Sequence, residues 1–274
     1  MWRKISHAIK TIRKWREEPL HIEFNLTDYC NLNCKGCTHY SPLAPEEYEP
    51  LERLERDARH IAGVKNAALI REVYLIGGET LLYPQLTRAI RIVRRHFPWV
   101  KLSVFTNGLL IPKMDEDFWK ACRETDCEIA LTRYPLKIDY DRIERICREK
   151  GVTATVFGDR GEESSFFRFP LDPEKKQNRM MSHIRCFSFG CITIDGGRIY
   201  PCSLSACVKH LNTRLGTDFR HEKGDYIEVE KLTDARQLLT LRNRPVPFCG
   251  YCKRITDVKY GPSRRSVEEW VDTK

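Results

Sequence analysis

The sequence predicts an α/β protein that joins a parallel sheet over residues 20–180 to a small cysteine-rich module over residues 181–274. One observation predicts the sheet. Five short β-like runs alternate with four helical runs, and strand, helix, strand in repetition forms a parallel sheet with right-handed crossovers. A second observation predicts the module: the polar stretch 159–180 loses the periodicity, and six cysteines follow it. Such sheets carry their chemistry at the carboxyl ends of the strands.

The N-terminal residues 1–19 predict a basic amphipathic helix. Apolar side chains recur at helical spacing with lysines and arginines around them, at Trp2, Ile5, Ile9, Ile12 and Trp15. We expect this helix to pack on the body of the protein with its basic face in solvent. The alternative is a helix that contacts an anionic membrane surface or polymer.

Each element of the sheet follows from a change of periodicity along the chain. The strands are expected at residues 21–27, 72–77, 101–106, 127–132 and 153–157. The helices place Leu, Ile or Ala at i, i+3 and i+4, and are expected at residues 48–62, 84–96, 114–125 and 139–150. The first strand therefore ends just before the sequence CNLNCKGC.

The remaining elements belong to the linker and the module. The stretch 159–180 predicts a linker with one short strand at SFFRF, residues 165–169. Two β-like runs then flank Asp195-Gly196-Gly197, which is a hairpin signal. A helix is expected near residues 233–242, before the sequence PFCGYC and a charged tail.

Composition excludes several classes of protein. Hydrophobic residues make up 41% and charged residues 31% of the chain, as in ordinary globular proteins. No apolar run approaches the ~18 residues of a membrane span, and no secretory signal is visible. The 12 cysteines cluster in short C-x2-C and C-x3-C pieces, which favours metal binding in a reducing cytosol over disulfides. The net charge of +9 allows an anionic partner without naming one.

Cys30, Cys34 and Cys37 lie directly after the first expected strand. Three thiolates are one ligand short of a tetrahedral zinc site or a fully ligated iron–sulfur cluster. One interpretation is structural zinc completed by His39 or a distant cysteine. The other is a [4Fe–4S] cluster on three thiolates, whose open iron can be chelated by the amine and carboxylate of an amino acid.

The C-x3-C-x2-C spacing after the first strand resembles the signature of the radical S-adenosylmethionine (SAM) superfamily. This resemblance implies an incomplete (β/α)6 barrel with Cys30, Cys34 and Cys37 as ligands of a [4Fe–4S] cluster. In that family the open iron binds SAM, which is cleaved reductively to a 5′-deoxyadenosyl radical. The resemblance also implies a reducing partner such as flavodoxin or ferredoxin.

Two further stretches are similar to SAM-binding motifs of this family. Gly77-Gly78-Glu79 ends the second expected strand, like the Gly-Gly-Glu motif that binds the SAM amino group. Glycine there lets the backbone approach a ligand closely. Taken alone, these residues would also fit a strand-end turn. Thr106 and Asn107, in the sequence FTNG, close the third strand and are further SAM-site candidates.

One position departs from the family pattern. The residue before the third cysteine is often aromatic and packs near the adenine, whereas here it is Gly36. His39 and Tyr40 are the candidates for replacing that contact. Arg133 and Tyr134, just beyond the fourth strand, are expected to face the substrate pocket.

The cysteines of the C-terminal module resemble the ligands of a twitch extension, which is a short relative of the SPASM extension and holds one auxiliary [4Fe–4S] cluster. This resemblance implies Cys186, Cys202, Cys249 and Cys252 as ligands, with Cys191 as the alternative to Cys186. The layout is similar to that of 2-deoxy-scyllo-inosamine dehydrogenases, which oxidise a secondary alcohol on an aminocyclitol. A zinc ribbon is the alternative, since paired C-x2-C also suits zinc.

The other cysteines have no assigned ligand role. Cys207 has no evident partner in the sequence. Cys122, Cys127 and Cys147 lie within helix or strand patterns and are expected to be packed as small apolar residues.

We therefore expect a cytoplasmic radical SAM oxidoreductase with two [4Fe–4S] clusters that acts on a small molecule or glycan. A ribosomal-peptide maturase or an epimerase of the same superfamily is the alternative. Only about twenty residues precede the first strand, so a folded leader-peptide-binding domain is not expected there. A non-catalytic, metal-stabilised module that binds nucleic acid is the alternative from another class, although no RNA-recognition motif supports it. No catalytic residue is predicted.

Overall fold

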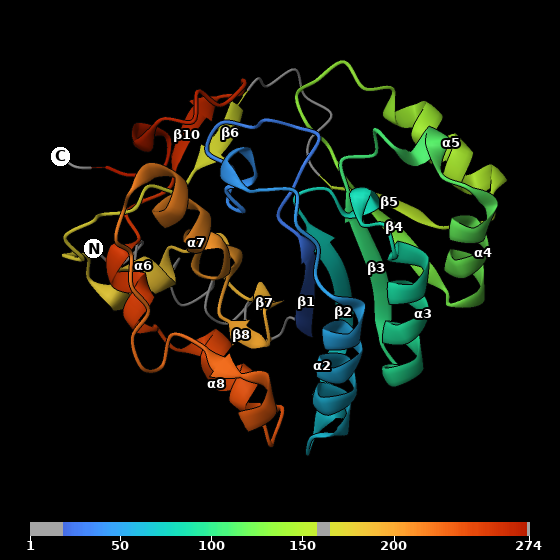
Figure 1. Cartoon of the computed structure of the whole chain (residues 1–274), viewed down its shortest axis with the longest axis horizontal. Coiled ribbons are helices and arrows are strands. Elements are labelled where there is room, and N and C mark those ends of the chain that lie inside the picture. The colour runs from blue at the N-terminus through green and yellow to red at the C-terminus, as the bar shows by residue number, and fades with distance from the viewer. Residues whose placement is uncertain (1–18, 158–164, 273–274) are drawn as a thin grey trace, which may run out of the picture.

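The structure is a computed structural model, and it describes residues 19–157 and 165–272 (Figure 1). The N-terminal helix expected at residues 1–19 lies, apart from its last residue, outside the described residues.

The main sheet has eight strands in the order β5-β4-β3-β2-β1-β7-β8-β9. Neighbouring strands from β1 to β5 pair in parallel, as the sequence predicts. The fold is therefore α/β with a predominantly parallel sheet. The parallel strands are β1 (Leu20–Thr27), β2 (Ile70–Gly77), β3 (Lys101–Thr106), β4 (Cys127–Thr132) and β5 (Ala154–Phe157).

The predicted hairpin continues this sheet on the other edge of β1. Strand β7 (Ile192–Asp195) pairs in parallel with β1, and β8 (Arg198–Tyr200) pairs antiparallel with β7. Strand β9 (Ile227–Glu228) pairs antiparallel with β8 and forms that edge of the sheet. Backbone hydrogen bonds thus join the two predicted parts of the chain within one sheet.

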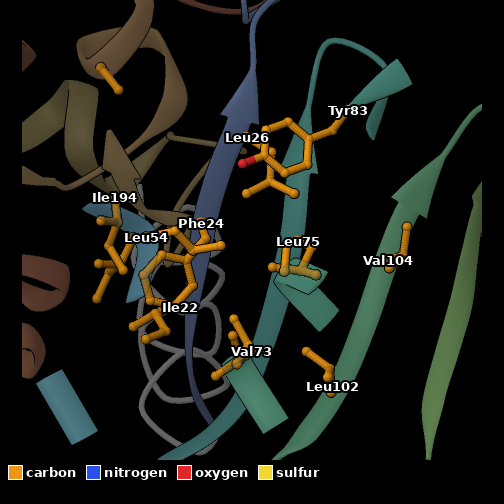
Figure 2. Close-up of a cluster of buried hydrophobic side chains, with 14 of the residues drawn as sticks. Ile22, Phe24, Leu26, Leu54, Val73, Leu75, Tyr83, Leu102, Val104 and Ile194 are labelled. Carbon is orange, nitrogen blue, oxygen red and sulfur yellow. The ribbon is translucent and has the colours of Figure 1, made fainter. Parts of the chain in front are cut away.

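Four helices cover the outer side of the parallel strands (Figure 1). They are α2 (Leu51–Gly63), α3 (Leu86–His96), α4 (Glu116–Glu124) and α5 (Tyr140–Glu149). Asp115 and Asp139 are the N-cap residues of α4 and α5. Each side chain accepts a hydrogen bond from a backbone N–H of the first turn of its helix. Figure 2 shows the core under α2, where side chains of β1, β2, β3 and β7 meet.

Alternate residues of the strands point to the opposite, inner face of the sheet. His21 of β1 lies 4.9 Å from Tyr74 of β2 between ring centroids. Tyr74 in turn lies 4.8 Å from Phe105 of β3, and Phe105 stacks on Phe157 of β5 at 5.7 Å. The inner face of the barrel therefore carries a row of aromatic rings.

The C-terminal module contains helices that the sequence analysis did not predict as well as one that it did. The helix expected near 233–242 is α8 (Arg236–Asn243), whereas α6 (Arg179–Ile184) and α7 (Ser203–Leu215) were not predicted. Burial around most of α7 removes the amphipathic pattern, since its buried residues are Ser203, Leu204, Ser205, Ala206, Cys207, Val208, His210 and Leu211.

The short strand predicted at SFFRF is β6 (Ser165–Arg168), which pairs with β10 (Thr256–Lys259) in a separate two-stranded antiparallel sheet. Short 3-10 segments complete the described chain, at Ser41–Leu43, Ala67–Leu69, Thr80–Leu82, Ile111–Lys113, Val229–Lys231, Pro247–Tyr251 and Val267–Glu269.

Candidate active site

The three N-terminal cysteines share the loop that follows β1, residues 28–40, here called the cysteine loop. Cys34 is buried, and Cys30 and Cys37 are half-buried. The loop lies at the carboxyl end of the parallel strands, where α/β sheets bind their ligands.

Residues 260–271, here called the C-terminal segment, hold the cysteine loop in place. The Lys35 N–H donates to the Gly261 carbonyl at 3.0 Å, and the Trp270 indole N–H donates to the Cys37 carbonyl at 3.0 Å. The Tyr260 hydroxyl lies 3.4 Å from the Cys34 sulfur, although 226 residues separate the two in sequence. Sequence reasoning missed this support, because no local pattern connects positions so far apart.

The three thiols fit a cationic ligand. Burial raises the pKa of Cys34 to about 11, the hydrogen bond with Tyr260 opposes the rise, and the Cys37 thiolate adds to it. Burial also raises the pKa of Cys30, and the charges of Cys37, Glu79 and Cys34 raise it further. Bound iron supplies the positive charge that reverses such shifts and keeps thiols ionised. The donor set therefore suits a cluster on three thiolates.

Gly77 and Gly78 lie where the end of β2 packs on the start of the cysteine loop. A Cβ on Gly77 would stand 2.2 Å from the Thr27 carbonyl oxygen, and one on Gly78 would stand 2.4 Å from the carbonyl oxygens of Asp28 and Tyr29. The Gly78 N–H donates to the Thr27 carbonyl at 2.7 Å. The close approach that requires glycine is thus to the chain's own backbone.

Glu79 joins the ends of β2 and β3. One carboxylate oxygen accepts hydrogen bonds from the Leu81 N–H at 2.9 Å and the Thr106 hydroxyl at 2.6 Å, and the other accepts from the Asn107 N–H at 2.9 Å. The Asn107 side chain donates to Asn31 in the cysteine loop at 2.8 Å. Three of about four acceptor positions of the carboxylate are filled by donors of the chain itself.

Gly36 occupies a backbone position that favours glycine, with φ of +73°. The two residues expected to replace the missing aromatic contact have other partners. Tyr40 is buried against Trp270, with ring centroids 6.0 Å apart. His39 Nδ1 lies 3.7 Å from an oxygen of Asp28.

Arg133 and Tyr134, although adjacent in sequence, contact different parts of the structure. The Arg133 guanidinium lies 4.8 Å from the ring centroid of Tyr140, on α5. The Tyr134 ring lies 6.2 Å from that of Tyr260. Burial raises the pKa of Tyr134, and the thiolates of the cysteine loop raise it further. Tyr134 therefore lies beside the cysteine loop, whereas Arg133 packs on α5.

The C-terminal cysteines meet at a second place. Cys186, Cys202, Cys249 and Cys252 line one cavity of about 290 Å³ between α6, the start of α7 and the Pro247–Tyr251 segment. Cys191 is not among its lining residues. The geometry thus groups the four cysteines that the twitch resemblance implies, with Cys186 rather than Cys191 as the fourth.

The four thiols are also close enough for the charge of one to raise the pKa of another. Burial raises the pKa of Cys252, and the thiolates of Cys202, Cys249 and Cys186 raise it further. Four mutually destabilising thiolates around one cavity suit a metal group, and the donor set fits either a [4Fe–4S] cluster or tetrahedral zinc.

The remaining cysteines are neither in the cysteine loop nor among the residues that line the four-cysteine cavity. Cys122, Cys127 and Cys147 are buried in the hydrophobic core, as predicted. Cys191 lies with His21 and Glu23 on the inner face of the sheet, their candidate ligand atoms all within 4.8 Å of one another. Cys207 has partners that the sequence did not reveal, which are described below.

Within residues 19–157 and 165–272, no helix is both long and apolar enough to cross a membrane.

Comparisons with known proteins place the cysteine loop in a family. Residues 24–156 match the family model of the Radical SAM superfamily. GTP 3′,8-cyclase of Helicobacter pylori (strain HPAG1) is 26% identical over 141 residues, which cover 50% of this chain and 41% of that protein. The antilisterial bacteriocin subtilosin biosynthesis protein AlbA of Bacillus subtilis (strain 168) is 31% identical over 108 residues, or 39% of this chain and 22% of that protein. The chain thus matches less than half the length of these relatives.

Solved structures are similar to this chain at low sequence identity. The structure of native anSMEcpe with bound AdoMet is similar with a TM-score of 0.50 and 13% identity, over 82% of this chain and 81% of that chain. The structure of BtrN in complex with AdoMet and 2-DOIA gives a TM-score of 0.49 and 14% identity, over 87% of this chain and 94% of that chain.

Proposed function

Because residues 24–156 form a radical SAM domain, we propose that this protein is an oxidoreductase that uses SAM and two [4Fe–4S] clusters to oxidise a small-molecule alcohol. A carbohydrate-like alcohol is the proposed substrate. The observation that carries the proposal is the cavity where Cys186, Cys202, Cys249 and Cys252 meet, because oxidation needs an electron acceptor.

The cysteine loop would hold the first cluster through Cys30, Cys34 and Cys37. Bound there, the cluster and SAM would supply the chemistry that removes a hydrogen atom from the substrate. The chain's own residues position this site: Glu79 fixes the ends of β2 and β3, and the C-terminal segment covers the loop from one side.

The four-cysteine cavity would complete the oxidation. When an alcohol carbon loses a hydrogen atom, the remaining radical becomes a ketone by losing the hydroxyl proton and one electron. An iron–sulfur cluster on four thiolates is suited to accept that electron. A flavodoxin or ferredoxin would provide the separate electron that SAM cleavage consumes. Each turnover therefore consumes one SAM.

The inner face of the barrel supports a carbohydrate-like or aminocyclitol substrate. It combines the aromatic rings of Tyr74 and Phe105 with the carboxylates of Glu23 and Glu72, and the Tyr74 hydroxyl donates to Glu72. Small-molecule sites typically pair apolar rings with a few polar groups that fix orientation. Carboxylates there favour hydroxyl or ammonium groups over phosphates.

Epimerisation is the second candidate, and one observation favours it. An epimerase returns a hydrogen atom to the substrate radical, often from a thiol. Cys191 offers a thiol beside His21 and Glu23, on the inner face of the sheet. The same radical could therefore be quenched instead of oxidised.

We also propose a cytoplasmic location, because the cysteines cluster in short C-x2-C and C-x3-C pieces, which suit metal binding in a reducing compartment.

Product analysis under anaerobic conditions tests the reaction class. The reconstituted protein would be incubated with SAM, dithionite and a panel of aminocyclitols and sugar alcohols deuterated at the carbinol carbon, with 2-deoxy-scyllo-inosamine as the first probe. Oxidation predicts deuterium in 5′-deoxyadenosine, one SAM consumed per product, and a ketone product that has lost the deuterium of the carbinol carbon and the hydrogen of its hydroxyl group. Cys34→Ala should form no 5′-deoxyadenosine.

Two results would contradict the proposal. A product of unchanged hydrogen content that takes up one solvent deuterium at carbon would establish epimerisation. Retained 5′-deoxyadenosine formation by Cys34→Ala would remove the cysteine loop from the chemistry.

A further inference from the structure

Three potential metal ligands that belong to neither cysteine cluster meet between the cysteine loop and α7. Asp28 and His39 come from the loop, and Cys207 comes from α7. The Cys207 sulfur lies 3.2 Å from Asp28 Oδ1 and 3.8 Å from His39 Nδ1, and the two loop atoms lie 3.7 Å apart. One oxygen, one nitrogen and one sulfur therefore form a small triangle.

The triangle has the size of one face of a tetrahedral zinc site. Zinc binds oxygen and nitrogen at about 2.0–2.2 Å and sulfur at about 2.3 Å, so ligand atoms at tetrahedral angles stand roughly 3.3–3.6 Å apart. The separations here, 3.2–3.8 Å, bracket that range. Asp28 and Cys207 are buried and His39 is half-buried, and their candidate ligand atoms all lie within 4.8 Å of one another.

Surrounding groups support Asp28 as a ligand. Its Oδ1 also accepts a hydrogen bond from the Asn25 amide at 2.8 Å, and its Oδ2 lies 2.7 Å from His210 Nε2. Carboxylates that bind metals are typically oriented by such outer contacts. His210 follows Cys207 by three residues on α7, so one face of this helix provides both a ligand and its support.

The local charge also favours a cation. Asp28 and Asp195 are two carboxylates of low exposure, and Lys209 pairs with both, at 3.4 Å and 2.6 Å respectively. A thiolate at Cys207 would add a further negative charge, which a divalent ion would balance. A cavity of about 110 Å³ lies beside this group and is lined by Asp28, Lys209 and His210.

We propose that Asp28, His39 and Cys207 bind one Zn²⁺ ion, with the fourth position left for water. Mixed sulfur, nitrogen and oxygen ligands are typical of zinc. The ion would connect the cysteine loop to α7 and so tie the radical SAM domain to the C-terminal module. This inference does not depend on the proposed reaction, because it uses none of the proposed cluster ligands.

Metal analysis of the anaerobically purified, full-length holoenzyme tests the site. We expect about one zinc per chain alongside iron, after dialysis against a small excess of Zn²⁺. X-ray absorption at the zinc edge should show one sulfur at about 2.3 Å and the other ligands as nitrogen or oxygen at about 2.0–2.2 Å. His39→Ala and Cys207→Ser should each lower zinc occupancy at least tenfold and leave iron content unchanged. Cys147→Ala, at a buried cysteine elsewhere in the core, should keep both metals.

Three results would overturn the inference. The first is a holoenzyme that binds no zinc, which would leave the three residues as a hydrogen-bonded cluster. The second is zinc bound by four sulfurs, which would place the ion in the Cys249–Cys252 cavity. The third is equal zinc in the wild type and in His39→Ala, a half-buried position where the variant is expected to fold and where circular dichroism can verify that it has.

Discussion

At the scale of single residues, Glu79 connects strand ends to the cysteine loop through Asn107. Glu79→Gln replaces one acceptor oxygen with an NH₂ group, which then faces the Asn107 N–H or the donors of Leu81 and Thr106. Because the side chain is buried, we expect the unfolding free energy to fall by about 1–3 kcal/mol and SAM to bind more weakly. Urea unfolding and equilibrium SAM binding under anaerobic conditions measure the two effects.

Glu52→Gln is the matched control, since Glu52 is exposed on α2. Glu52→Gln should change neither the unfolding free energy nor the affinity for SAM measurably. If Glu79→Gln behaves like this control, the hydrogen bonds of Glu79 do not organise the SAM site.

Cys186 and Cys191 provide a second test at this scale. Two [4Fe–4S] clusters imply about eight irons per chain. Because Cys186 lines the four-cysteine cavity and Cys191 does not, Cys186→Ala should retain about four irons and Cys191→Ala should retain all of them. Iron and acid-labile sulfide analysis after reconstitution gives the count. If Cys191→Ala loses four irons and Cys186→Ala loses none, Cys191 is the ligand. A wild type with four irons and one zinc bound by four sulfurs would instead support a zinc ribbon.

Local spacing predicted the residues whose partners are near in sequence. Cys30, Cys34 and Cys37 lie within one stretch of eight residues shortly after a strand end, so their pattern is visible without the fold. The group around Asp28 was not predicted, because 179 residues separate it from Cys207. The choice between Cys186 and Cys191 also depends on which side chain faces the cavity, and no periodicity sets that orientation.

At the scale of elements, the end of β2 packs so closely on the cysteine loop that glycine is required there. In Gly78→Ala, the new Cβ would meet two backbone carbonyl oxygens, neither of which is a flexible side chain. We expect a loss of about 1–3 kcal/mol in unfolding free energy and weaker SAM binding, because β2 must move away from β1. Gly63→Ala, at the end of α2 and in open space, should leave stability unchanged or raise it by up to about 1 kcal/mol. Equal stabilities of the two variants would contradict this close packing.

The sequence predicted the elements of the barrel better than those of the module. The strands and helices from β1 to β5 show clear periods, because each helix has one buried and one exposed side. Helix α7 lacks this contrast, since even Ser205 is fully buried along with Cys207. Strand β6 was expected near its observed place, but its partner β10 lies about 90 residues away in the tail, at Thr256–Lys259.

At the scale of the whole molecule, β1 is the shared centre of the two parts of the chain. It pairs with β2 on one edge and with β7 on the other. Figure 2 shows Ile194 of β7 in the same cluster as Phe24 of β1 and Leu54 of α2. The sequence predicted both the barrel strands and the hairpin, but not that the hairpin would join β1, because strand order depends on long-range contacts.

This shared strand predicts that the two parts unfold together. Ile194 is buried and lies opposite Phe24 in the β1–β7 register, so Ile194→Ala should lower the unfolding free energy by about 2–5 kcal/mol. Hydrogen exchange followed by mass spectrometry should then show faster exchange by a similar factor in peptides covering residues 20–27 and 192–200, because opening β7 removes the hydrogen bonds on one edge of β1. Leu69→Ala, at a residue 39% exposed, should alter neither peptide. Faster exchange confined to residues 192–200 would mean that the module opens independently, and that the barrel is stable without it.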